Sequence, residues 1–429
     1  MRSPTMRLLP RFRNWIWSRP REKSSAVRIG SSVTQLSSIK SRKAKAKGKK
    51  FSAVPMLDLR RQYQEIRSEV LAAIERVCAS QSFILGPEVE ALEGEVAAFT
   101  GVGDAIGCAS GTDALWLALR AASVQPGDVV VTTPFSFFAS ASAIVRAGAR
   151  PIFADIDPST LNIDPAKVEA RLQAGGSYKV RALLPVHLYG QCADMDNLQR
   201  LCGDYQLTMI EDAAQAIGGT WRDRRAGSFG TAAAFSFYPS KNLSAYGEAG
   251  LVTTQDPELA KHMRRLRNHG SPQRYHHEEF GWNCRMDAIQ AAILRVKLLH
   301  IENWSQQRRE RAASYQRLFT EAGLLSTDDS PIRQLDARPQ AQPVFHQYVI
   351  RARRRDELRE FLSNRKIGTE VYYPVPLHLQ PCFAYLGYRQ GDLPESERAA
   401  GEVVALPMFP ELTVEEQRYV VDSIADFYS

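Results

Sequence analysis

Residues 207–215 have the sequence LTMIEDAAQ, in which an apolar run ends abruptly in two carboxylates, Glu211 and Asp212. A short apolar run of this kind is typical of a buried strand. A carboxylate at the end of a buried strand is costly unless a cation or hydrogen-bond donors lie next to it. The segment therefore predicts a cationic partner for Asp212. The alternative is that Asp212 only caps a following helix.

A second strand-like segment, FSFYPSKN at residues 235–242, breaks at Pro239 and presents Lys241 29 residues after Asp212. A lysine taken alone is usually a solvated surface charge. A lysine that acts as a nucleophile must instead lie on a rigid turn and be partly removed from water, so that its amine can be neutral. The turn at Pro239 makes Lys241 a candidate for this role.

Two earlier segments also lie where a strand is followed by a helix. The first, ASGTDAL at residues 109–115, opens a helix with small residues, and the free N–H groups at such a helix end bind phosphate. The second, PFSFFA at residues 134–139, places aromatic rings after a strand, where one ring could lie flat on a ligand. Taken singly, the first segment is more simply a capped helix and the second is more simply core packing.

The order of the four segments favours one common site. A phosphate-binding turn, an aromatic ring, a strand-end carboxylate and a lysine are the groups that would hold a phosphorylated pyridine aldehyde. A carboxylate raises the pKa of a pyridine nitrogen by charge attraction, and the protonated ring withdraws electrons from a bound substrate. The sequence therefore predicts Lys241 as an imine-forming amine and Asp212 as the partner of the ring nitrogen.

Strand-like and helical segments alternate around this site, which is typical of an α/β protein with a sheet covered on both faces. A helix is expected from Leu57 onward, and a long helix from about Asp287 to Ser305 has the length of a connector between domains. The predicted organisation is a basic disordered extension at residues 1–54, a large domain with a mostly parallel central sheet at 55–300, and a smaller α+β domain at 301–429.

The formal net charge of +8 is unevenly distributed. Residues 1–50 hold 15 Lys and Arg with one acidic residue, Glu22, and the remainder holds 40 basic and 46 acidic residues. The body of the protein is therefore mildly acidic, so no nucleic acid is expected as its partner. The extension is a tether to an anionic surface, a targeting segment, a solvated tail or the product of a misassigned start.

The six cysteines, Cys78, Cys108, Cys192, Cys202, Cys284 and Cys382, include no C-x-x-C pair and accompany no histidine cluster. Neither a metal site nor a disulfide framework is therefore predicted, and a reducing cytoplasm fits best. The longest apolar runs are strand-sized, so no membrane span is expected.

From about Leu57 to the C-terminus the chain resembles the DegT/DnrJ/EryC1/StrS family of pyridoxal-phosphate (PLP) dependent sugar aminotransferases, which have the PLP-dependent transferase type I fold. The segments that carry the resemblance are SGTDAL at 110–115, PFSFFAS at 134–140, PVHLYGQ at 185–191, EDAAQAIG at 211–218, SFYPSKNLSAYGEAG at 236–250 and GWNCRMDAIQAAIL at 281–294. Two features depart from the family pattern: the basic extension, and Ser140 in place of the usual Thr or Ala. The family also contains dehydratases with histidine in place of the lysine, and Lys241 argues against that branch.

The resemblance implies a role for each matching residue. Lys241 forms the Schiff base with PLP, Asp212 pairs with the pyridine nitrogen, Gln215 lies near the ring hydroxyl, and Phe137 lies on the ring face. The phosphate is expected at Gly111, Thr112 and Ser236. Asn283 is expected to reach the phosphate in the neighbouring subunit of a homodimer; the alternative is that Asn283 caps the helix that begins near Asp287.

The implied reaction transfers an amino group from an amino acid, by resemblance L-glutamate, to a nucleotide-linked keto sugar for glycan, polysaccharide or secondary-metabolite biosynthesis. Arg285, Tyr373 and His378 are candidate contacts for the nucleotide sugar, since a diphosphate favours a guanidinium and a base favours a nearby ring. The alternatives are an ion pair for Arg285 and loop packing for Tyr373 and His378. A 3-keto sugar joined to UDP or dTDP is preferred over a 4-keto sugar. A rival function is a regulatory or nucleic-acid-binding protein that acts through the basic extension.

Overall fold

The structure, a computed structural model, describes residues 53–175, 179–325 and 329–429. The predicted basic extension therefore lies outside the described residues, except at its end. There, Val54 is completely buried, its N–H donates to Lys366 O at 2.9 Å, and its carbonyl accepts from Gly368 N at 2.8 Å. The folded part thus includes Val54, which the sequence had placed in the extension.

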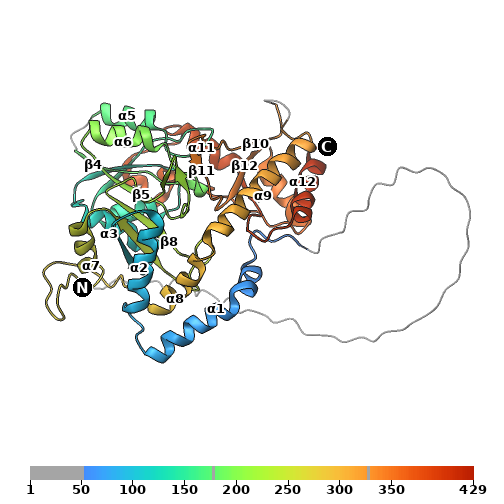
Figure 1. Cartoon of the computed structure of the whole chain (residues 1–429). Helices are drawn as coiled ribbons and strands as arrows, with labels where there is room; N and C mark the ends of the chain where they lie inside the picture. Colours follow the sequence, from blue (N-terminus) through green and yellow to red (C-terminus); the bar gives the residue numbers. More distant parts are fainter. Residues whose placement is uncertain (1–52, 176–178, 326–328) are drawn as a thin grey trace, which may run out of the picture. The chain divides into compact units, whose positions relative to one another are not determined.

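A seven-stranded sheet forms the centre of the protein (Figure 1). Its strands in spatial order are β1 (Asp104–Cys108), β9 (Gly250–Thr254), β8 (Ala232–Ser236), β5 (Thr208–Asp212), β4 (Val180–Leu184), β2 (Val129–Thr132) and β3 (Arg150–Phe153). The five strands from β8 to β3 are parallel to their neighbours, and β9 is antiparallel to both β1 and β8. The α/β fold with a mostly parallel sheet is confirmed.

The middle residues of the strands are mostly apolar because helices cover both faces of the sheet. Neighbouring residues of a strand point to opposite faces: Leu183 and Met209 belong to one buried cluster, and Leu184 and Ile210 belong to the other. One face is covered by α1 (Leu59–Ser80), α2 (Pro87–Thr100), α5 (Pro165–Gln173), α6 (Met195–Asp204) and α8 (Ala288–Leu298). The other face is covered by α3 (Gly111–Ala121), α4 (Ala139–Arg146) and α7 (Pro257–Leu266).

A second group of elements follows α8 and surrounds a three-stranded antiparallel sheet. Its members are α9 (Ile301–Glu321), β10 (Ile332–Gln334), β12 (Tyr348–Ala352), α10 (Arg355–Asn364), β13 (Val403–Leu406) and α12 (Val414–Tyr428). They enclose a separate hydrophobic cluster that also includes Val54. This cluster is consistent with a C-terminal α+β domain, although the boundary near residue 300 stays a prediction.

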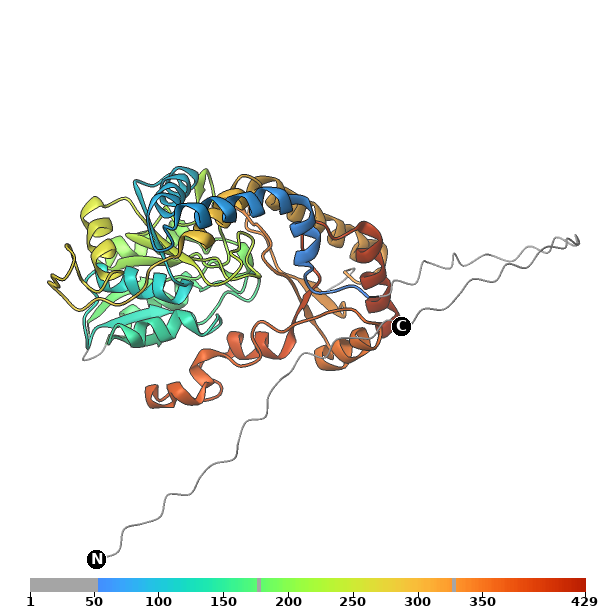
Figure 2. The same cartoon turned by 90° about the horizontal axis from the view of Figure 1, so that it is seen from below.

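The predicted connector helix from Asp287 to Ser305 is wrong in one respect, because it is two helices. The chain turns at Leu299 and His300, where His300 N donates to Lys297 O at 3.0 Å. The turn lets α8 pack in the core under the large sheet, while α9 contributes Ala312 and Leu318 to the C-terminal cluster. Figure 2 shows α1 running alongside α8 and the beginning of α9.

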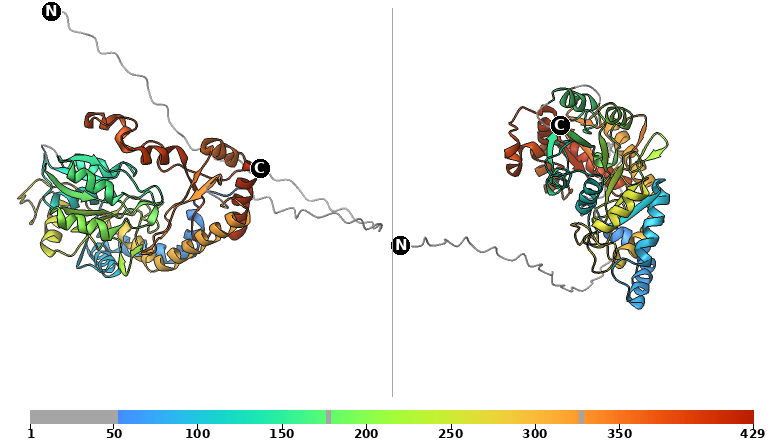
Figure 3. Two further views of the ribbon diagram at one scale, coloured as in Figure 1. Left: turned by 90° about the horizontal axis from the view of Figure 1, so that it is seen from above. Right: turned by 90° about the vertical axis from the view of Figure 1, so that its left-hand side faces the viewer.

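The segment between α10 and β13 returns to the large sheet (Figure 3). It contains η2 (Leu377–Leu379), η3 (Pro381–Leu386) and α11 (Pro394–Glu402). Leu377 and Phe383 pack with Ala141 of α4 and Phe153 of β3 in one small buried cluster. A short η1 (Leu188–Gly190) follows β4, and β6 (Thr220–Trp221), β7 (Arg224–Arg225) and β11 (Ala341–Gln342) form a third, minor sheet.

In the described part of the chain, no helix is long and apolar enough to cross a membrane.

Candidate active site

One cavity of about 910 Å³ lies at the carboxyl-terminal edge of the large sheet. Strands β1, β2, β5 and β8 all run toward this edge, so the segments that follow them in the sequence meet there. The cavity is lined by seven of the eight residues predicted from the sequence to bind the cofactor: Gly111, Thr112, Phe137, Asp212, Gln215, Ser236 and Lys241. Their predicted roles are untested, but the structure brings their side chains and backbone into one place.

The first part of the site is the N-terminus of α3. Ser110 caps this helix, since its hydroxyl oxygen accepts from Asp113 N at 3.1 Å. The first N–H groups of a helix have no acceptor within the helix, so the amides after Ser110 remain free for an anion. The same turn can therefore both cap the helix and bind a phosphate, so the two interpretations of this segment are compatible.

Close packing fixes the shape of this turn. A Cβ atom added at Gly111 would lie 2.6 Å from Ser236 Cβ, and one added at Gly250 would lie 2.2 Å from Ser110 O. Gly111 thus allows the end of β8 to approach the start of α3, and Gly250 allows the start of β9 to do the same. As a result, the Ser236 hydroxyl and the amides of α3 line the same end of the cavity.

Asp212 is the last residue of β5, and its side chain is directed into a polar corner of the cavity. Its Oδ2 accepts from Ser140 Oγ at 2.7 Å, and its Oδ1 accepts from Ala214 N at 3.2 Å. The residue is only 4% exposed. Burial raises the pKa of Asp212, although the bond from Ser140 and the charge of Lys241 act in the opposite direction. Ser140 thus directly contacts this carboxylate.

Glu211 points to the other side of β5 and is stabilised there without a ligand. Its carboxylate accepts from the backbone N–H groups of Gly227 at 2.8 Å and of Phe229 and Gly230, each at 2.7 Å. The buried His187 ring lies 2.9 Å away from it. Of the two adjacent carboxylates, only Asp212 is therefore available to a cation in the cavity.

Lys241 lies on the turn after β8, where its N–H donates to Tyr238 O at 2.8 Å. Burial lowers the pKa of Lys241 from 10.5 to about 8, and the negative charge of Asp212 partly offsets this effect. A lysine with a pKa of about 8 has a substantial neutral fraction near physiological pH. The amine is therefore suited to nucleophilic attack and to proton transfer.

The three aromatic residues after β2 have different surroundings. Phe135 is buried in the core, and Phe138 packs against Phe383 with ring centroids 5.6 Å apart. Phe137 lines the cavity and is 57% exposed, with its ring 6.3 Å from that of Tyr373. Phe137 is thus the member of this group whose ring is free to cover a ligand.

Gln215 and Tyr373 form a hydrogen-bonded pair in the cavity wall. The Gln215 side-chain carbonyl accepts from Tyr189 N at 2.7 Å, and its amide nitrogen donates to the Tyr373 hydroxyl at 3.1 Å. Burial raises the pKa of Tyr373 well above its usual value, so this phenol stays protonated. Tyr373 is the one predicted substrate contact that lines the cavity in the described chain.

Asn283 and Arg285 do not line this cavity. Asn283 is exposed, and it does not cap the following helix, because the side chain of Asp287 accepts from Gln290 N at 2.9 Å and caps α8. Arg285 donates to the Asn268 side-chain carbonyl at 2.9 Å. The capping alternative for Asn283 is therefore wrong, and the ion pair considered for Arg285 is replaced by a bond to an amide.

His378 is placed away from the cavity and is packed in the protein interior. Its side chain is completely buried, and its Nε2 lies 3.0 Å from Glu397 Oε1. The ring also contacts Tyr388 edge to face at a centroid distance of 5.9 Å. These contacts correspond to the packing alternative and do not support His378 as a substrate contact.

Several cavity residues carry no signal in the sequence. Ser136, Tyr238 and Glu248 line the cavity from within the predicted motifs, where no role was assigned to them, and it is also lined by four residues outside every motif, His346, Gln347, Glu370 and Tyr372. The last four of these residues come from the C-terminal group of elements, more than 100 positions after Lys241 in the sequence. Their placement depends on how that group packs on the large sheet, which local patterns do not reveal.

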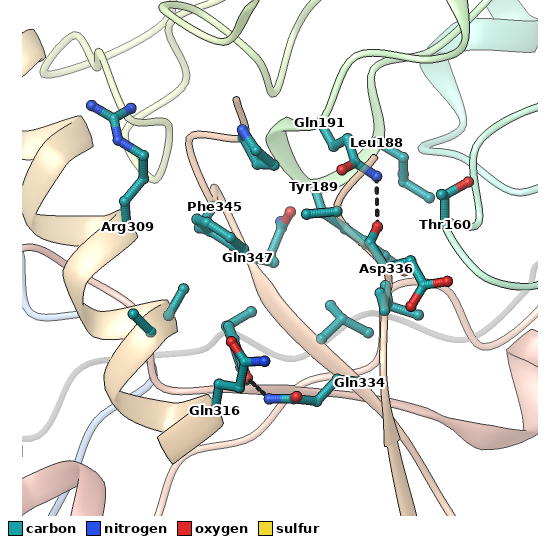
Figure 4. Close-up of a pocket in the computed structure, with 17 residues that line it drawn as sticks. Thr160, Leu188, Tyr189, Gln191, Arg309, Gln316, Gln334, Asp336, Phe345 and Gln347 are labelled. Carbon is teal, nitrogen blue, oxygen red and sulfur yellow. Dashed lines mark hydrogen bonds between the residues drawn. The ribbon is translucent and has the colours of Figure 1, made fainter. Parts of the chain in front are cut away.

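Figure 4 shows a second cavity, of about 440 Å³. Tyr189, Arg309, Gln316 and Asp336 are among the residues that border it, and Gln347 borders both cavities. In this second cavity, Gln191 Nε2 donates to Asp336 O at 3.0 Å. The chemistry is assigned to the larger cavity because that cavity contains both Lys241 and Asp212.

Comparison with protein families gives an independent result. The model of the DegT/DnrJ/EryC1/StrS aminotransferase family matches residues 64–425. A curated protein from Geobacillus stearothermophilus, named as a pleiotropic regulatory protein, is 51% identical over 377 residues, which cover 87% of this chain and 98% of that protein. The dTDP-3-amino-3,4,6-trideoxy-alpha-D-glucose transaminase of Streptomyces venezuelae is 43% identical over 374 residues, which cover 87% of this chain and 96% of the transaminase.

Comparison with solved structures agrees with the sequence comparisons. The crystal structure of Streptomyces venezuelae DesV in complex with a ketimine intermediate matches with a TM-score of 0.83 at 43% identity. The match covers 87% of this chain and 98% of that chain. The similarity thus includes both the large sheet and the C-terminal group of elements.

Proposed function

Because the chain belongs to the DegT/DnrJ/EryC1/StrS family of PLP-dependent aminotransferases, we propose that it moves an amino group from an amino acid to a nucleotide-linked keto sugar. The observation that carries the proposal is the pairing of Lys241 with Asp212 in one cavity, beside a helix N-terminus shaped by Gly111. PLP needs an amine of lowered pKa, a buried carboxylate and a site that binds its phosphate.

The residues of the cavity fit PLP. The free amides of α3 with Thr112 and Ser236 would hold its phosphate, and Phe137 would cover its ring. Asp212 lacks a full counter-charge in its buried position, which a protonated ring nitrogen would supply. When bound, PLP supplies an electron-withdrawing ring that stabilises negative charge on the carbon next to the amino group.

The residues of the chain then have separate tasks. Asp212 keeps the proton on the ring nitrogen, because a nearby carboxylate raises the pKa of that nitrogen. The Lys241 amine takes the proton from the α-carbon of the amino donor, a step that its lowered pKa favours near neutral pH. Gln215 and Tyr373 line the cavity and are joined by a hydrogen bond.

The proposed amino donor is L-glutamate, and the proposed acceptor is a 3-keto sugar joined to UDP or dTDP. The name of the Streptomyces venezuelae relative, a dTDP-3-amino sugar transaminase, supports this substrate class. Tyr373 is the proposed substrate contact, since its ring and hydroxyl line the cavity.

The proposed assembly is a homodimer in which Asn283 reaches the phosphate site of the neighbouring subunit. The exposed side chain of Asn283, which is not used to cap α8, supports this role. We also propose that the enzyme works in the cytoplasm, because all six cysteines are free thiols.

The test is to add L-glutamate to the purified PLP-loaded protein and then to supply a panel of nucleotide-linked keto sugars. We expect glutamate to convert the Schiff-base absorbance band into that of the amine form, and one class of keto sugar to restore the first band with formation of an amino sugar. The Lys241→Ala variant is the control and should show neither change. A wild-type spectrum that glutamate leaves unchanged would contradict the proposal.

The rival function, a regulator that acts through the basic extension, is kept because a 51% identical relative bears a regulatory name. Removing residues 1–52 separates the two functions. The deletion should stop there because Val54 is buried and hydrogen-bonded to Lys366 and Gly368. The enzyme should keep its turnover after the deletion, whereas a nucleic-acid binder should lose its salt-dependent affinity.

A further inference from the structure

His346 is a buried histidine in the wall of the cofactor cavity, on the segment just before β12. Three contacts fix the backbone of this segment. His346 N donates to Tyr189 O at 2.8 Å, Val344 N donates to Gly190 O at 3.0 Å, and the buried Arg308 guanidinium donates to His346 O at 3.5 Å. The segment approaches η1 so closely that a Cβ added at Gly190 would lie 3.0 Å from His346 N. The backbone that carries the ring therefore has little freedom to move.

The neighbouring Asn242 determines which ring nitrogen of His346 carries the proton. Asn242 Nδ2 donates to Val344 O at 3.0 Å, which fixes the orientation of the amide. Its Oδ1 is then the atom that lies 3.3 Å from His346 Nδ1. A carbonyl oxygen can only accept, so Nδ1 must be protonated, and in the neutral ring Nε2 must be an unprotonated acceptor.

The surroundings keep this ring neutral. Burial, followed by the positive charges of Lys241 and Arg308, holds the pKa of His346 well below its usual range. Arg308 lies on α9, and Glu411 partly balances its charge. Besides Lys241 and His346, the titratable residues that line the cavity are Asp212, Tyr238, Glu248, Glu370, Tyr372 and Tyr373.

We propose that His346 is a positioning residue for Lys241, and this inference rests on the proposed function. The Nε2 atom of His346 accepts a hydrogen bond from the Lys241 amine whenever that amine is not covalently bound. Among the described residues, Nε2 has no other hydrogen-bond partner, and it belongs to the cavity that contains Lys241. Asn242, which directly follows Lys241 in the chain, accepts a hydrogen bond from Nδ1 and so orients the ring. A neutral acceptor at this place stabilises the lysine ammonium without adding a second positive charge.

Two substitutions separate the two nitrogens of the ring. His346→Gln keeps a polar group near the position of Nε2, and His346→Asn keeps one near Nδ1 but none at Nε2. In cofactor-free protein, the rate of Schiff-base formation with added PLP, followed by absorbance against pH, reports the pKa of Lys241. Loss of the acceptor destabilises the ammonium form, so His346→Asn should lower this midpoint by about one pH unit, a tenfold change in the acid constant. His346→Gln should leave the midpoint close to that of the wild type.

A second readout is the exchange of the α-proton of L-glutamate with deuterated solvent in PLP-loaded protein. His346→Asn should slow this exchange about tenfold, as expected when one hydrogen bond to a charged group is lost. His346→Gln should slow it much less. A purely structural role would instead make both variants unstable and leave the midpoint of the correctly folded fraction unchanged.

Asn242→Asp provides a test that does not alter the histidine. A carboxylate at this position still accepts from Nδ1–H and makes the neutral ring a stronger acceptor at Nε2, so the Lys241 midpoint should rise. Equal midpoints in the wild type, His346→Asn and Asn242→Asp would overturn the inference, and so would equal damage in His346→Asn and His346→Gln. A wild-type protein that forms no Schiff base with PLP would count against the proposed function instead.

Discussion

Lys241 and Asp212 are both taken out of water, and burial shifts the pKa of each toward its neutral form. Each charge opposes the shift of the other, so the two groups are electrostatically linked in the cofactor-free protein. A bound cation at Asp212 would change this balance and leave the amine of Lys241 more easily neutral. The effect of each residue on the other can therefore be compared in the protein with and without bound PLP.

The first prediction concerns the pH dependence of Lys241. Because burial lowers its pKa to about 8, the rate at which PLP forms a Schiff base with cofactor-free protein should rise through pH 8 and then level off. Asp212→Asn removes the negative charge that raises the pKa of Lys241, so the midpoint of this rate profile should move to lower pH. A midpoint near 10.5 in the wild type would show that Lys241 is an ordinary solvated lysine.

The second prediction concerns stability. The pKa of Asp212 is higher in the folded protein than in the unfolded chain, so protonation of Asp212 favours folding. This contribution to the free energy of unfolding is fully present below the pKa of the unfolded chain. It is lost as the pH rises through the pKa of the folded protein. At neutral pH, Asp212→Asn should therefore raise the melting temperature of the cofactor-free protein by about 2 °C, the effect of roughly 1 kcal/mol.

The sign of this effect should depend on the cofactor. With PLP bound, the same substitution removes the partner of the ring nitrogen, so Asp212→Asn should lower the melting temperature relative to the PLP-loaded wild type. Scanning calorimetry of both forms at pH 7.5 and near pH 4 measures the effect. A variant that is destabilised equally with and without PLP would contradict the assigned role of Asp212.

The sequence could predict Asp212 because it ends an apolar strand, and Lys241 because it lies on a turn directly after another; a charged group is costly in either place unless it has a partner or a function. Glu211 has the same signal but a different explanation, since its donors are the amides of Gly227, Phe229 and Gly230 on a later turn. His346 lies 104 residues from Asn242, and no local pattern marks it. Pairs that form only on folding are not visible to reasoning from neighbouring residues.

At the scale of elements, the contact between the start of α3 and the end of β8 shapes the anion seat. The third prediction is that Gly111→Ala will weaken PLP binding about 10- to 100-fold, because the new Cβ would lie 2.6 Å from Ser236 Cβ and must displace the turn. Gly94→Ala in α2 is the matched control, since nothing lies within 4 Å of its added Cβ. It should bind PLP normally and be slightly more stable. Titration of both cofactor-free variants with PLP measures the difference.

Short apolar runs predict strands at residues 129–133, 151–154, 182–187, 207–211 and 232–237, and the ends of β2, β3, β4, β5 and β8 each lie within three residues of these bounds. The strands β1 and β9 were missed. They complete the sheet as an antiparallel extension next to β8, and their register is set by pairing with each other. The break between α8 and α9 was also missed, because both sides of Leu299 and His300 have helical periodicity and only tertiary packing separates them.

At the scale of the whole molecule, the cavity combines segments from the large sheet with His346, Gln347 and Tyr373 from the C-terminal group of elements. Family resemblance anticipated the fold and the cofactor, and the structure and comparisons confirm both. The substrate contacts were harder to predict. Only Tyr373 of the three candidates lies in the cavity, because the buried pair of His378 and Glu397 and the bond from Arg285 to Asn268 depend on packing.

The fourth prediction concerns assembly. If Asn283 completes the site of a partner subunit, Lys241→Ala and Asn283→Ala proteins should each be inactive alone. Mixed dimers formed by joint refolding should contain one intact site, because the Lys241 of one subunit then meets the Asn283 of the other. An equal mixture should recover about a quarter of the wild-type activity, as expected for random pairing in a symmetric dimer. No recovery, with mixed dimers shown to be present, would mean that Asn283 acts in its own subunit or not at all.

The central claim is that Lys241 forms the covalent link to PLP. Borohydride reduction of the yellow PLP-loaded protein, followed by peptide mass analysis, tests it most directly. The account predicts that the reduced cofactor is found on the peptide that contains Lys241 and is absent from that peptide in unreduced protein. Cofactor fixed to a different lysine, or protein that remains colourless and unlabelled at saturating PLP, would contradict the account.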